Sequence, residues 1–133
     1  MIFVDYRAGS KELILPLRKL GLDVSETSLD FGDLAWEGRG TAGQPVLVGV
    51  EFKKLDELVQ AIRTERLQGH QLVGMRDTYR YSYLLYEGEL LYDKAGLLQQ
   101  QKKGRFGKPK LFPMPGHMTV NELLKRVHVL HLC

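Results

Sequence analysis

The stretch Val46-Leu-Val-Gly-Val-Glu-Phe-Lys53 has the most regular pattern in the chain and decides how the rest is interpreted. Its side chains alternate with a period of two, which is typical of a β-strand. One face of this strand carries Val46, Val48, Val50 and Phe52, and the other carries Gly49, Glu51 and Lys53. The sequence therefore predicts a strand with one apolar face, and with an acid and an amine side by side on the opposite face.

The segments on both sides of this strand predict an α/β protein. Residues 37–45 are rich in glycine and indicate a turn from a preceding strand, and the apolar spacing of residues 54–63 predicts an amphipathic helix. The remaining expected elements are a strand over residues 1–5, a helix that follows the cap Ser10 and ends at Gly21, extended chain over 24–29, a strand over 81–86 and a helix from about Thr119. Pro16 should make the first of these helices either start late or kink. This order predicts helices flanking a mixed central sheet.

A basic segment at about residues 94–118 divides the charge of the chain unevenly. Its cations are Lys94, Lys102, Lys103, Arg105, Lys108 and Lys110, and it contains no acid. Because the whole chain carries a net charge of +3, the remainder without these six cations carries −3. Such asymmetry indicates a polyanionic partner, with DNA as the usual candidate, although a solvated lysine-rich loop is the open alternative. The glycines and prolines of this segment predict a flexible, irregular structure.

Length and composition limit the classes of protein that remain. A chain of 133 residues with 44% hydrophobic residues predicts a single domain with a real core. No apolar run approaches the roughly 20 residues that cross a bilayer, so we expect no membrane partner. A single cysteine, Cys133, and the lack of a secretory signal predict an intracellular protein without a disulfide framework.

Three side chains form the strongest candidate site, namely Asp33 at a strand end and Glu51 with Lys53 on the next strand. Two carboxylates supply the hard oxygen ligands that Mg²⁺ or Mn²⁺ prefers, and such a metal can activate water for attack on a phosphodiester. A nearby lysine can orient that water or stabilise charge on the phosphate. Asp5, at the end of the first strand, is an additional carboxylate. The alternative is a simple Glu51–Lys53 ion pair on an exposed sheet edge.

Five short blocks of sequence occur in an order that resembles one known family. The blocks are Val4-Asp5-Tyr6-Arg7-Ala8, Gly32-Asp33, Glu51-Phe52-Lys53-Lys54-Leu55-Asp56-Glu57, Arg66-Leu67 followed by Gln71, and Tyr83-Leu84-Leu85-Tyr86-Glu87-Gly88. They resemble the motifs of the XPF-type structure-specific endonucleases, a branch of the PD-(D/E)XK superfamily. The similarity extends over about residues 2–88, and its main departure is Ala8, which stands where the family pattern has glutamate.

The resemblance implies a restriction-endonuclease-like fold and a role for each matching residue. Asp33 and Glu51 would bind the divalent metal, Lys53 would be the catalytic lysine, and Asp5 would be an accessory acid near the metal. Arg7 and Arg66 would belong to the surface that faces DNA. Members of this family cut one strand of branched or flapped DNA, commonly as homodimers or heterodimers, so the expected partners are DNA and a second chain.

The helix-hairpin-helix domains that often follow this nuclease domain have no counterpart in this sequence. The basic segment, with Lys102, Lys103, Arg105, Lys108 and Lys110 interleaved with Phe106 and Phe112, is the expected substitute for DNA contact. Its cations would neutralise phosphates, and an aromatic side chain could stack on an unpaired base. The alternative function is a non-catalytic DNA-binding or dimer-partner subunit that retains the nuclease fold, which Ala8 keeps open.

Overall fold

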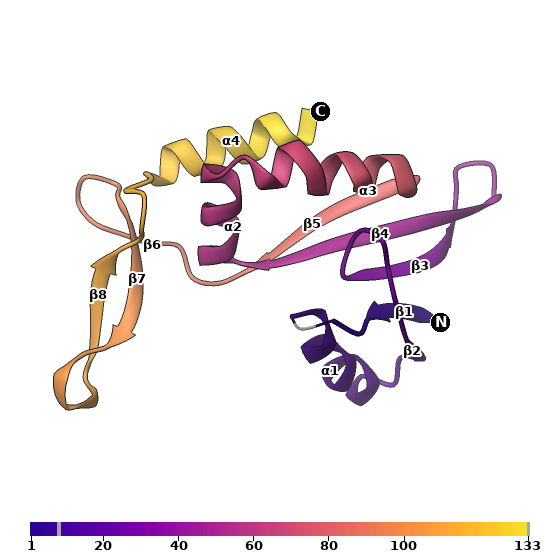
Figure 1. The fold of residues 1–133 in the computed structure, drawn as a ribbon, viewed down its shortest axis with the longest axis horizontal. Coiled ribbons are helices and arrows are strands. Elements are labelled where there is room, and N and C mark those ends of the chain that lie inside the picture. Colours follow the sequence, from indigo (N-terminus) through magenta and orange to yellow (C-terminus); the bar gives the residue numbers. More distant parts are fainter. Residues whose placement is uncertain (8, 133) are drawn as a thin grey trace. The chain divides into compact units, whose positions relative to one another are not determined.

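The computed structural model describes residues 1–7 and 9–132, with side chains up to His128 (Figure 1). In chain order the elements are β1 (Ile2–Asp5), a 3-10 turn (Ser10–Leu13), α1 (Ile14–Lys19), β2 (Val24–Thr27), β3 (Leu34–Arg39), β4 (Pro45–Lys54), α2 (Leu55–Arg63), a π-helical turn (Leu67–Gln71), α3 (Leu72–Thr78), β5 (Tyr81–Glu87), β6 (Leu91–Tyr92), β7 (Leu98–Lys103), a 3-10 turn (Arg105–Gly107), β8 (Pro109–Pro113) and α4 (Val120–Leu132). Within the described part of the chain, no helix is long and apolar enough to cross a membrane.

The chain divides into two compact units. We call residues 1–53 and 69–86 the sheet unit, and residues 54–68 together with those from 87 onward the hairpin unit. The main sheet has the strand order β2-β1-β3-β4-β5. Strand β1 pairs with β2 in parallel, whereas β1 with β3 and β3 with β4 are antiparallel. The predicted mixed sheet of an α/β protein is thus confirmed.

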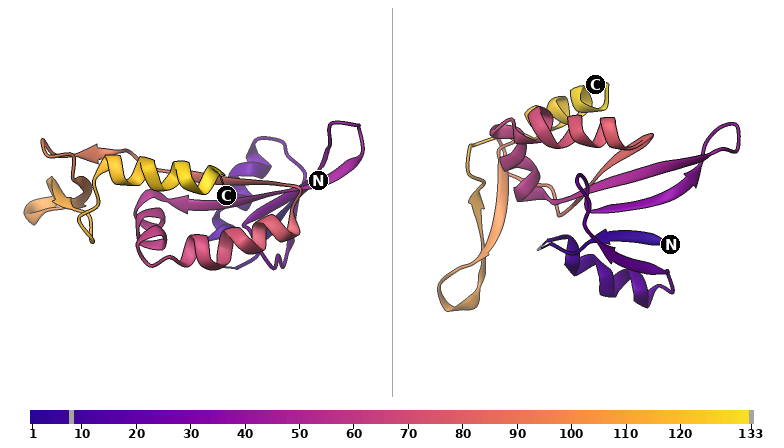
Figure 2. Two further views of the ribbon diagram at one scale, coloured as in Figure 1. Left: turned by 90° about the horizontal axis from the view of Figure 1, so that it is seen from above. Right: turned by 45° about the vertical axis from the view of Figure 1, so that its right-hand side comes forward.

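Helices α1 and α3 cover opposite faces of the strands in the sheet unit (Figure 2). On one face Val4 and Val24 form a buried cluster with Ile14 of α1. On the other face Ala35 is buried with Met75 of α3 and with Tyr79, which follows it. The register explains this division, because Val4 pairs with Leu34 and the next residue, Ala35, must point to the opposite face.

Strand β4 is longer and more deeply buried than its alternating pattern predicts. Residues 48–51 are all buried, so both faces of the strand are covered and neither is solvent-exposed at this point. The reason is that β4 is an interior strand between β3 and β5. Gly49 also makes room for a ring, since an added Cβ at this position would lie 2.3 Å from Tyr79.

The first helix starts late, which is one of the two results expected from Pro16. The segment starts with a 3-10 turn, and α1 begins at Ile14, which places Pro16 in its first turn, where a missing N–H costs least. Ser10 was expected to cap this helix, but it makes no capping hydrogen bond there. Its hydroxyl instead donates to the carboxylate of Asp33, so the prediction of Ser10 as a cap was wrong.

The hairpin unit contains α2, α4 and a small sheet in the order β6-β7-β8. Helix α2 is confirmed at Leu55–Arg63, and Glu57 accepts a hydrogen bond from the backbone N–H of Lys54 at 3.1 Å. Helix α4 starts where predicted, because the hydroxyl of Thr119 accepts the N–H of Glu122 at 3.1 Å. The chain reverses after α2 at Glu65, whose φ is 58°, so Arg66 lies beyond the helix end.

The prediction that the basic segment is irregular was wrong. Residues 98–113 form an antiparallel β-hairpin, in which β7 and β8 pair from Gln99 with Pro113 to Lys103 with Pro109. The glycines lie in the tip, where Gly104 donates to the carbonyl of Lys108 at 2.6 Å. The prolines Pro109 and Pro113 occupy the two ends of β8, which is an edge strand, where a missing N–H removes little pairing.

Candidate active site

The register of the sheet unit brings the three predicted acids into one row. Across β1, β3 and β4, Phe3 pairs with Ala35 and Ala35 with Gly49. Two residues further toward the same end of each strand are Asp5, Asp33 and Glu51. Residues that pair across strands lie on the same face of a sheet, and so do alternate residues of one strand. All three acids therefore lie on the face of the sheet that α3 covers.

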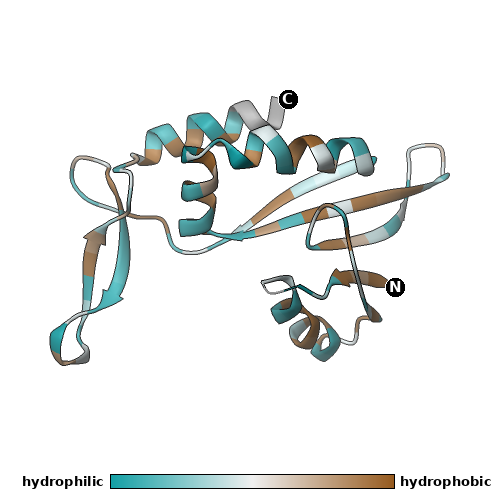
Figure 3. Ribbon diagram, in the orientation of Figure 1, coloured by the Kyte–Doolittle hydropathy of each residue, from teal (hydrophilic) through white to brown (hydrophobic). Residues whose placement is uncertain are grey.

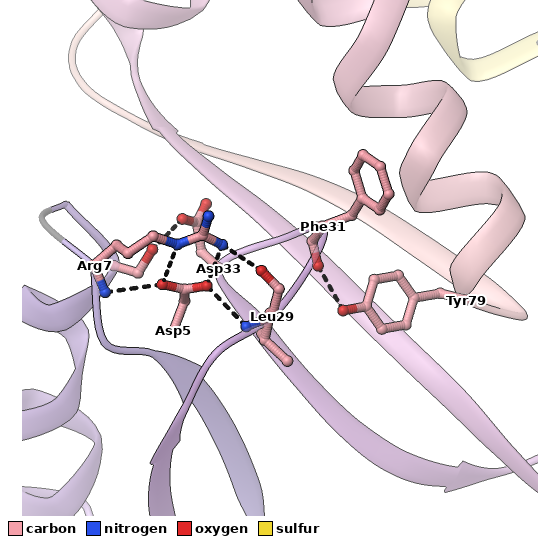
Figure 4. A network of polar contacts seen from close by, with 7 residues as sticks. Asp5, Arg7, Leu29, Phe31, Asp33 and Tyr79 are labelled. Carbon is pink, nitrogen blue, oxygen red and sulfur yellow. Dashed lines mark hydrogen bonds and ion pairs between the residues drawn. The ribbon is translucent and has the colours of Figure 1, made fainter.

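Asp5 is held by Arg7 and by the chain before Asp33 (Figure 4). One carboxylate oxygen, Oδ1, accepts the backbone N–H and the Nε–H of Arg7, both at 2.8 Å. The other, Oδ2, accepts Arg7 Nη2 at 2.5 Å and the N–H of Leu29 at 3.0 Å. These bonds use the roughly four lone-pair positions of a carboxylate. Asp5 therefore acts as a brace between β1 and the β2–β3 loop, and metal ligation by Asp5 would require Arg7 to move.

The electrostatics of this pair agree with its geometry. The hydrogen bond from the Arg7 side chain lowers the pKa of Asp5 from 3.8 to about 2, in opposition to the effect of burial. The same bond raises the pKa of Arg7, and the charges of Asp5 and Asp33 add smaller contributions. Arg7 also donates to the carbonyl of Leu29, yet its side chain remains 57% exposed. Arg7 thus combines a structural role with an accessible cation.

Asp33 lies at a bend immediately before β3, and its carboxylate contacts the backbone of β4. Its backbone N–H donates to Val50 at 2.8 Å, and its Oδ2 accepts the N–H of Phe52 at 2.7 Å. Its Oδ1 accepts the hydroxyl of the buried Ser10. The half-buried Asp33 carboxylate is consequently fixed beside the segment of β4 that carries Glu51.

Glu51 and Lys53 form an ion pair that is mostly shielded from water. Lys53 Nζ lies 3.1 Å from Glu51 Oε1, and the two side chains are 13% and 8% exposed, respectively. The alternative prediction placed this ion pair on an exposed edge of the sheet. That location was wrong, because β4 is an interior strand. Taking two charges out of water costs several kcal/mol per ion, and such groups are concentrated at functional sites.

The loop that carries Asp33 is anchored by Tyr79, the residue that follows α3, and the sequence did not predict this anchor. The Tyr79 hydroxyl donates to the Phe31 carbonyl at 2.6 Å (Figure 4). The Phe31 ring lies edge-on to His70, with ring centroids 5.6 Å apart. Burial raises the pKa of Tyr79, and the charges of Asp30, Asp5 and Glu51 raise it further. The available signal in the sequence was the pair of glycines, Gly49 and Gly74, that give the Tyr79 and Phe31 rings room.

The other predicted DNA-facing residues belong to the hairpin unit. Arg66 is exposed in the turn after α2, and Lys102, Lys103, Arg105, Lys108 and Lys110 are exposed on the β7–β8 hairpin. In the sheet unit, Gln71 has a buried side-chain oxygen that makes no hydrogen bond within the described part of the protein. Ala8, the departure from the family pattern, lies outside the described residues.

Within this row of three acids, Asp33 and Glu51 are the carboxylates that could hold a divalent metal without displacing Arg7. Among the described residues, no three histidine, cysteine, aspartate or glutamate side chains form a group that could hold a metal ion. Mg²⁺ does not need such a cage, since it commonly uses one or two carboxylates together with waters and substrate phosphates. Two carboxylates on adjacent strands, one of them buried, provide a donor set that fits Mg²⁺ or Mn²⁺.

Taken together, the mixed sheet, its flanking helices and its row of acids define a restriction-endonuclease-like α/β nuclease domain. A family model described as the ERCC4 domain matches residues 4–128. The chain therefore belongs to the ERCC4 domain family, which confirms the resemblance to XPF-type nuclease domains.

One similar solved structure is XPF from Aeropyrum pernix. The match has a TM-score of 0.63 and 18% sequence identity, and it covers 98% of this chain and 48% of that one. Similarity at this level of identity establishes the fold. The chain spans about half the length of the XPF structure that it matches. A comparison with curated proteins finds no match.

Proposed function

We propose that this protein is a DNA endonuclease that hydrolyses phosphodiester bonds with the help of a divalent metal. The observation that carries the proposal is the position of Asp33 beside the segment of β4 on which Glu51 and Lys53 form a buried pair. Membership of the ERCC4 domain family supports this function for that arrangement. Neither the family nor the fold by itself would identify the residues that do the chemistry.

In the proposed site, Asp33 and Glu51 hold the metal, Mg²⁺ or Mn²⁺. When bound, such an ion supplies Lewis acidity toward a phosphoryl oxygen and lowers the pKa of a bound water. Asp33 is suited to this role because Ser10 and the N–H of Phe52 fix its carboxylate. Glu51 is suited because its carboxylate starts from an interior strand, where little rearrangement of the backbone is possible.

Lys53 would act on the phosphate or on the attacking water. Its ammonium is held 3.1 Å from Glu51, so it stays next to the carboxylate that we assign to the metal. A fixed cation in a site shielded from water stabilises developing charge on a phosphate more strongly than an exposed cation does. Its other N–H bonds can orient a water molecule, because an ammonium group has three donors.

The preferred substrate, the partner chain and the cellular location are parts of the same proposal. We expect branched, flap or junction DNA as the substrate, a second copy or a related chain as a dimer partner, and a location inside the cell with DNA. The support for branched DNA is the resemblance to XPF-type nucleases together with the basic hairpin. Light scattering during size-exclusion chromatography measures the oligomeric state directly.

The test is cleavage of labelled flap, fork, four-way-junction and linear duplex DNA with Mg²⁺, Mn²⁺ or EDTA. Glu51→Gln removes the charge of the buried acid with little change in size, and we expect it to reduce cleavage by at least about a hundredfold, as loss of a major electrostatic group does. Asp33→Asn should act in the same direction. Glu37→Gln is the matched control, because Glu37 is an exposed acid of β3 that lies outside the site.

Each result has a definite meaning. Metal-dependent cutting that is lost in Glu51→Gln and kept in Glu37→Gln supports the proposal. Cleavage by Glu51→Gln at the wild-type rate would show that the metal site is assigned wrongly. Binding of branched DNA without any cleavage by the wild-type chain would favour the non-catalytic DNA-binding subunit instead.

A further inference from the structure

The β7–β8 hairpin concentrates positive charge without any compensating acid. We call residues 98–113 the basic hairpin; all five of its cations, Lys102, Lys103, Arg105, Lys108 and Lys110, are exposed. Figure 3 shows β7 in hydrophilic colours along most of its length. Lys102 lies directly opposite Lys110 in the ladder. Like charges in this arrangement destabilise a hairpin in isolation, so a bound polyanion would stabilise it.

The tip of the basic hairpin presents one aromatic side chain to solvent. Phe106 is 97% exposed, the highest value among the exposed large hydrophobic side chains that the structure describes. Its backbone has φ 63° and ψ 24°, which lies in the left-handed region that bulky residues rarely adopt. Gly107 follows with φ 73°, and the N–H of Gly107 donates to the carbonyl of Gly104 at 3.2 Å. The turn therefore holds the Phe106 ring away from the rest of the hairpin.

The second aromatic residue of the hairpin, Phe112, is in a different situation. It is only partly exposed, and Lys110 Nζ lies 5.6 Å from the centroid of its ring. This cation–π contact covers a face of the ring that a base would otherwise need. The structure thus separates the two phenylalanines, and Phe106 is the one that is available to a ligand.

We propose that Phe106 stacks on an unpaired base while the surrounding cations bind the adjacent phosphates. The basic hairpin would then recognise the boundary between double-stranded and single-stranded DNA. Phosphate contacts alone do not distinguish branched from linear DNA, because both present the same backbone charge. Stacking supplies the missing discrimination, since only an unpaired base exposes its π-face, and it tolerates any base sequence. This inference rests on the proposed function only in taking DNA as the ligand.

The experiment measures binding to two DNA probes in EDTA, so that cleavage plays no part. One probe carries 2-aminopurine at the first unpaired position of a flap, and the other carries it in a fully paired duplex of the same sequence. We expect the wild-type chain to quench 2-aminopurine in the flap. Phe106→Ala should abolish this quenching and weaken flap binding about tenfold, within the usual range for loss of one base–aromatic stack. Binding to the paired duplex should not change.

Two further variants keep the result interpretable. Phe106→Trp should restore quenching, because indole also stacks on bases. Tyr92→Ala is the matched control, since Tyr92 is an aromatic residue of β6 that is 61% exposed and lies outside the basic hairpin. Since Phe106 is almost fully exposed, Phe106→Ala should unfold at the same denaturant concentration as the wild-type chain.

Several outcomes would overturn the inference. These are unchanged quenching in Phe106→Ala, an equal loss of affinity for both probes, and failure of the wild-type chain to bind the flap. The proposed nuclease activity is tested separately, by the cleavage assay with Glu51→Gln. If cleavage is lost in Glu51→Gln and Phe106→Ala has no effect, the proposed nuclease function is supported and the stacking contact is rejected. If Phe106 stacks on the flap but no DNA is cleaved, the stacking contact is supported and the nuclease function is rejected.

Discussion

At the scale of single residues, Asp5 was predicted to lie near a metal, but in the structure its carboxylate stabilises the fold. Its two oxygens accept hydrogen bonds from Arg7 and from the N–H of Leu29, and its side chain is 1% exposed. The pKa of Asp5 is lowered to about 2, so the charged form is the one that the folded state favours. The brace therefore depends on the charge of Asp5.

Asp5 should make the stability of the protein sensitive to acid. Because its folded-state pKa lies below the ordinary value of 3.8, its contribution is fully present above that pH and is lost as the pH falls toward about 2. A shift of this size corresponds to roughly 2 kcal/mol. Asp5→Asn should lower the free energy of unfolding by about this amount at neutral pH and flatten its dependence on acid.

Urea unfolding at a series of pH values measures this effect. Asp77→Asn is the matched control, because Asp77 pairs only at the surface with Arg76 and its side chain is 68% exposed. A surface pair of this kind contributes little, so this variant should unfold like the wild-type chain. Equal pH profiles for Asp5→Asn and the wild-type chain would contradict the assigned role of Asp5.

At the scale of elements, the loop between β2 and β3 positions Asp33 through contacts on both sides. Leu29 is bound by Asp5, and the carbonyl of Phe31 is bound by Tyr79. The Phe31 ring lies so close to Gly74 that an added Cβ on Gly74 would come within 2.0 Å of it. The glycine in α3 is thus part of the support for the loop that carries Asp33.

Gly74→Ala should reverse the usual effect of this substitution in a helix. Alanine would normally stabilise a helix interior by about 1 kcal/mol relative to glycine. Here the clash with Phe31 should outweigh that gain, because overpacking typically costs about 1–3 kcal/mol. We expect a lower midpoint of thermal unfolding and, since the loop carries Asp33, slower cleavage as well.

Gly69→Ala supplies the comparison for this experiment. Apart from Gly69 itself, its chain neighbours and the nearby helix backbone, no described heavy atom would lie within 4 Å of a Cβ added at Gly69. This variant should therefore be as stable as the wild-type chain or slightly more stable. A Gly74→Ala protein that is also more stable would show that Phe31 is not packed against α3 as described.

At the scale of the whole molecule, charge is divided between the two units in a way that matches their proposed tasks. The carboxylates Asp5, Asp33 and Glu51 lie in the sheet unit, whereas the basic hairpin lies in the other. The proposed chemistry would use acids to hold a metal, and the proposed DNA binding would use cations. The acids of the candidate site and the cations of the basic hairpin therefore belong to different parts of the chain.

The basic hairpin should control the salt dependence of DNA binding. Replacing Lys102 and Lys110 by glutamine should reduce the slope of log affinity against log salt concentration by about 2, if each lysine neutralises one phosphate. Fluorescence anisotropy over a series of salt concentrations measures the slope. Replacing the exposed Lys11 and Lys19 of the sheet unit in the same way should leave it unchanged. Equal slopes for the hairpin variant and the wild-type chain would exclude these phosphate contacts.

Features that depend on local patterns could be predicted from the amino-acid sequence. Alternation identified β4, apolar spacing identified α2, and the hydroxyl of Thr119 identified the start of α4. The positions of Asp33, Glu51 and Lys53 in short motifs pointed to the candidate site and to the family. These features could be predicted because each is set by residues within a few positions of one another in the chain.

The partners of those residues depend on how distant parts of the chain pack together. Ser10 binds Asp33 rather than a helix end, because the strand register brings residues 23 positions apart into contact. Asp5 binds Arg7 and Leu29, which fill its lone-pair positions, and long-range packing against Gly49 and Gly74 fixes Tyr79 and Phe31. Four of the breakers in the basic segment fall at the tip and at the strand ends of a regular hairpin, namely Gly104, Gly107, Pro109 and Pro113, so pairing between strands overrode local propensity there.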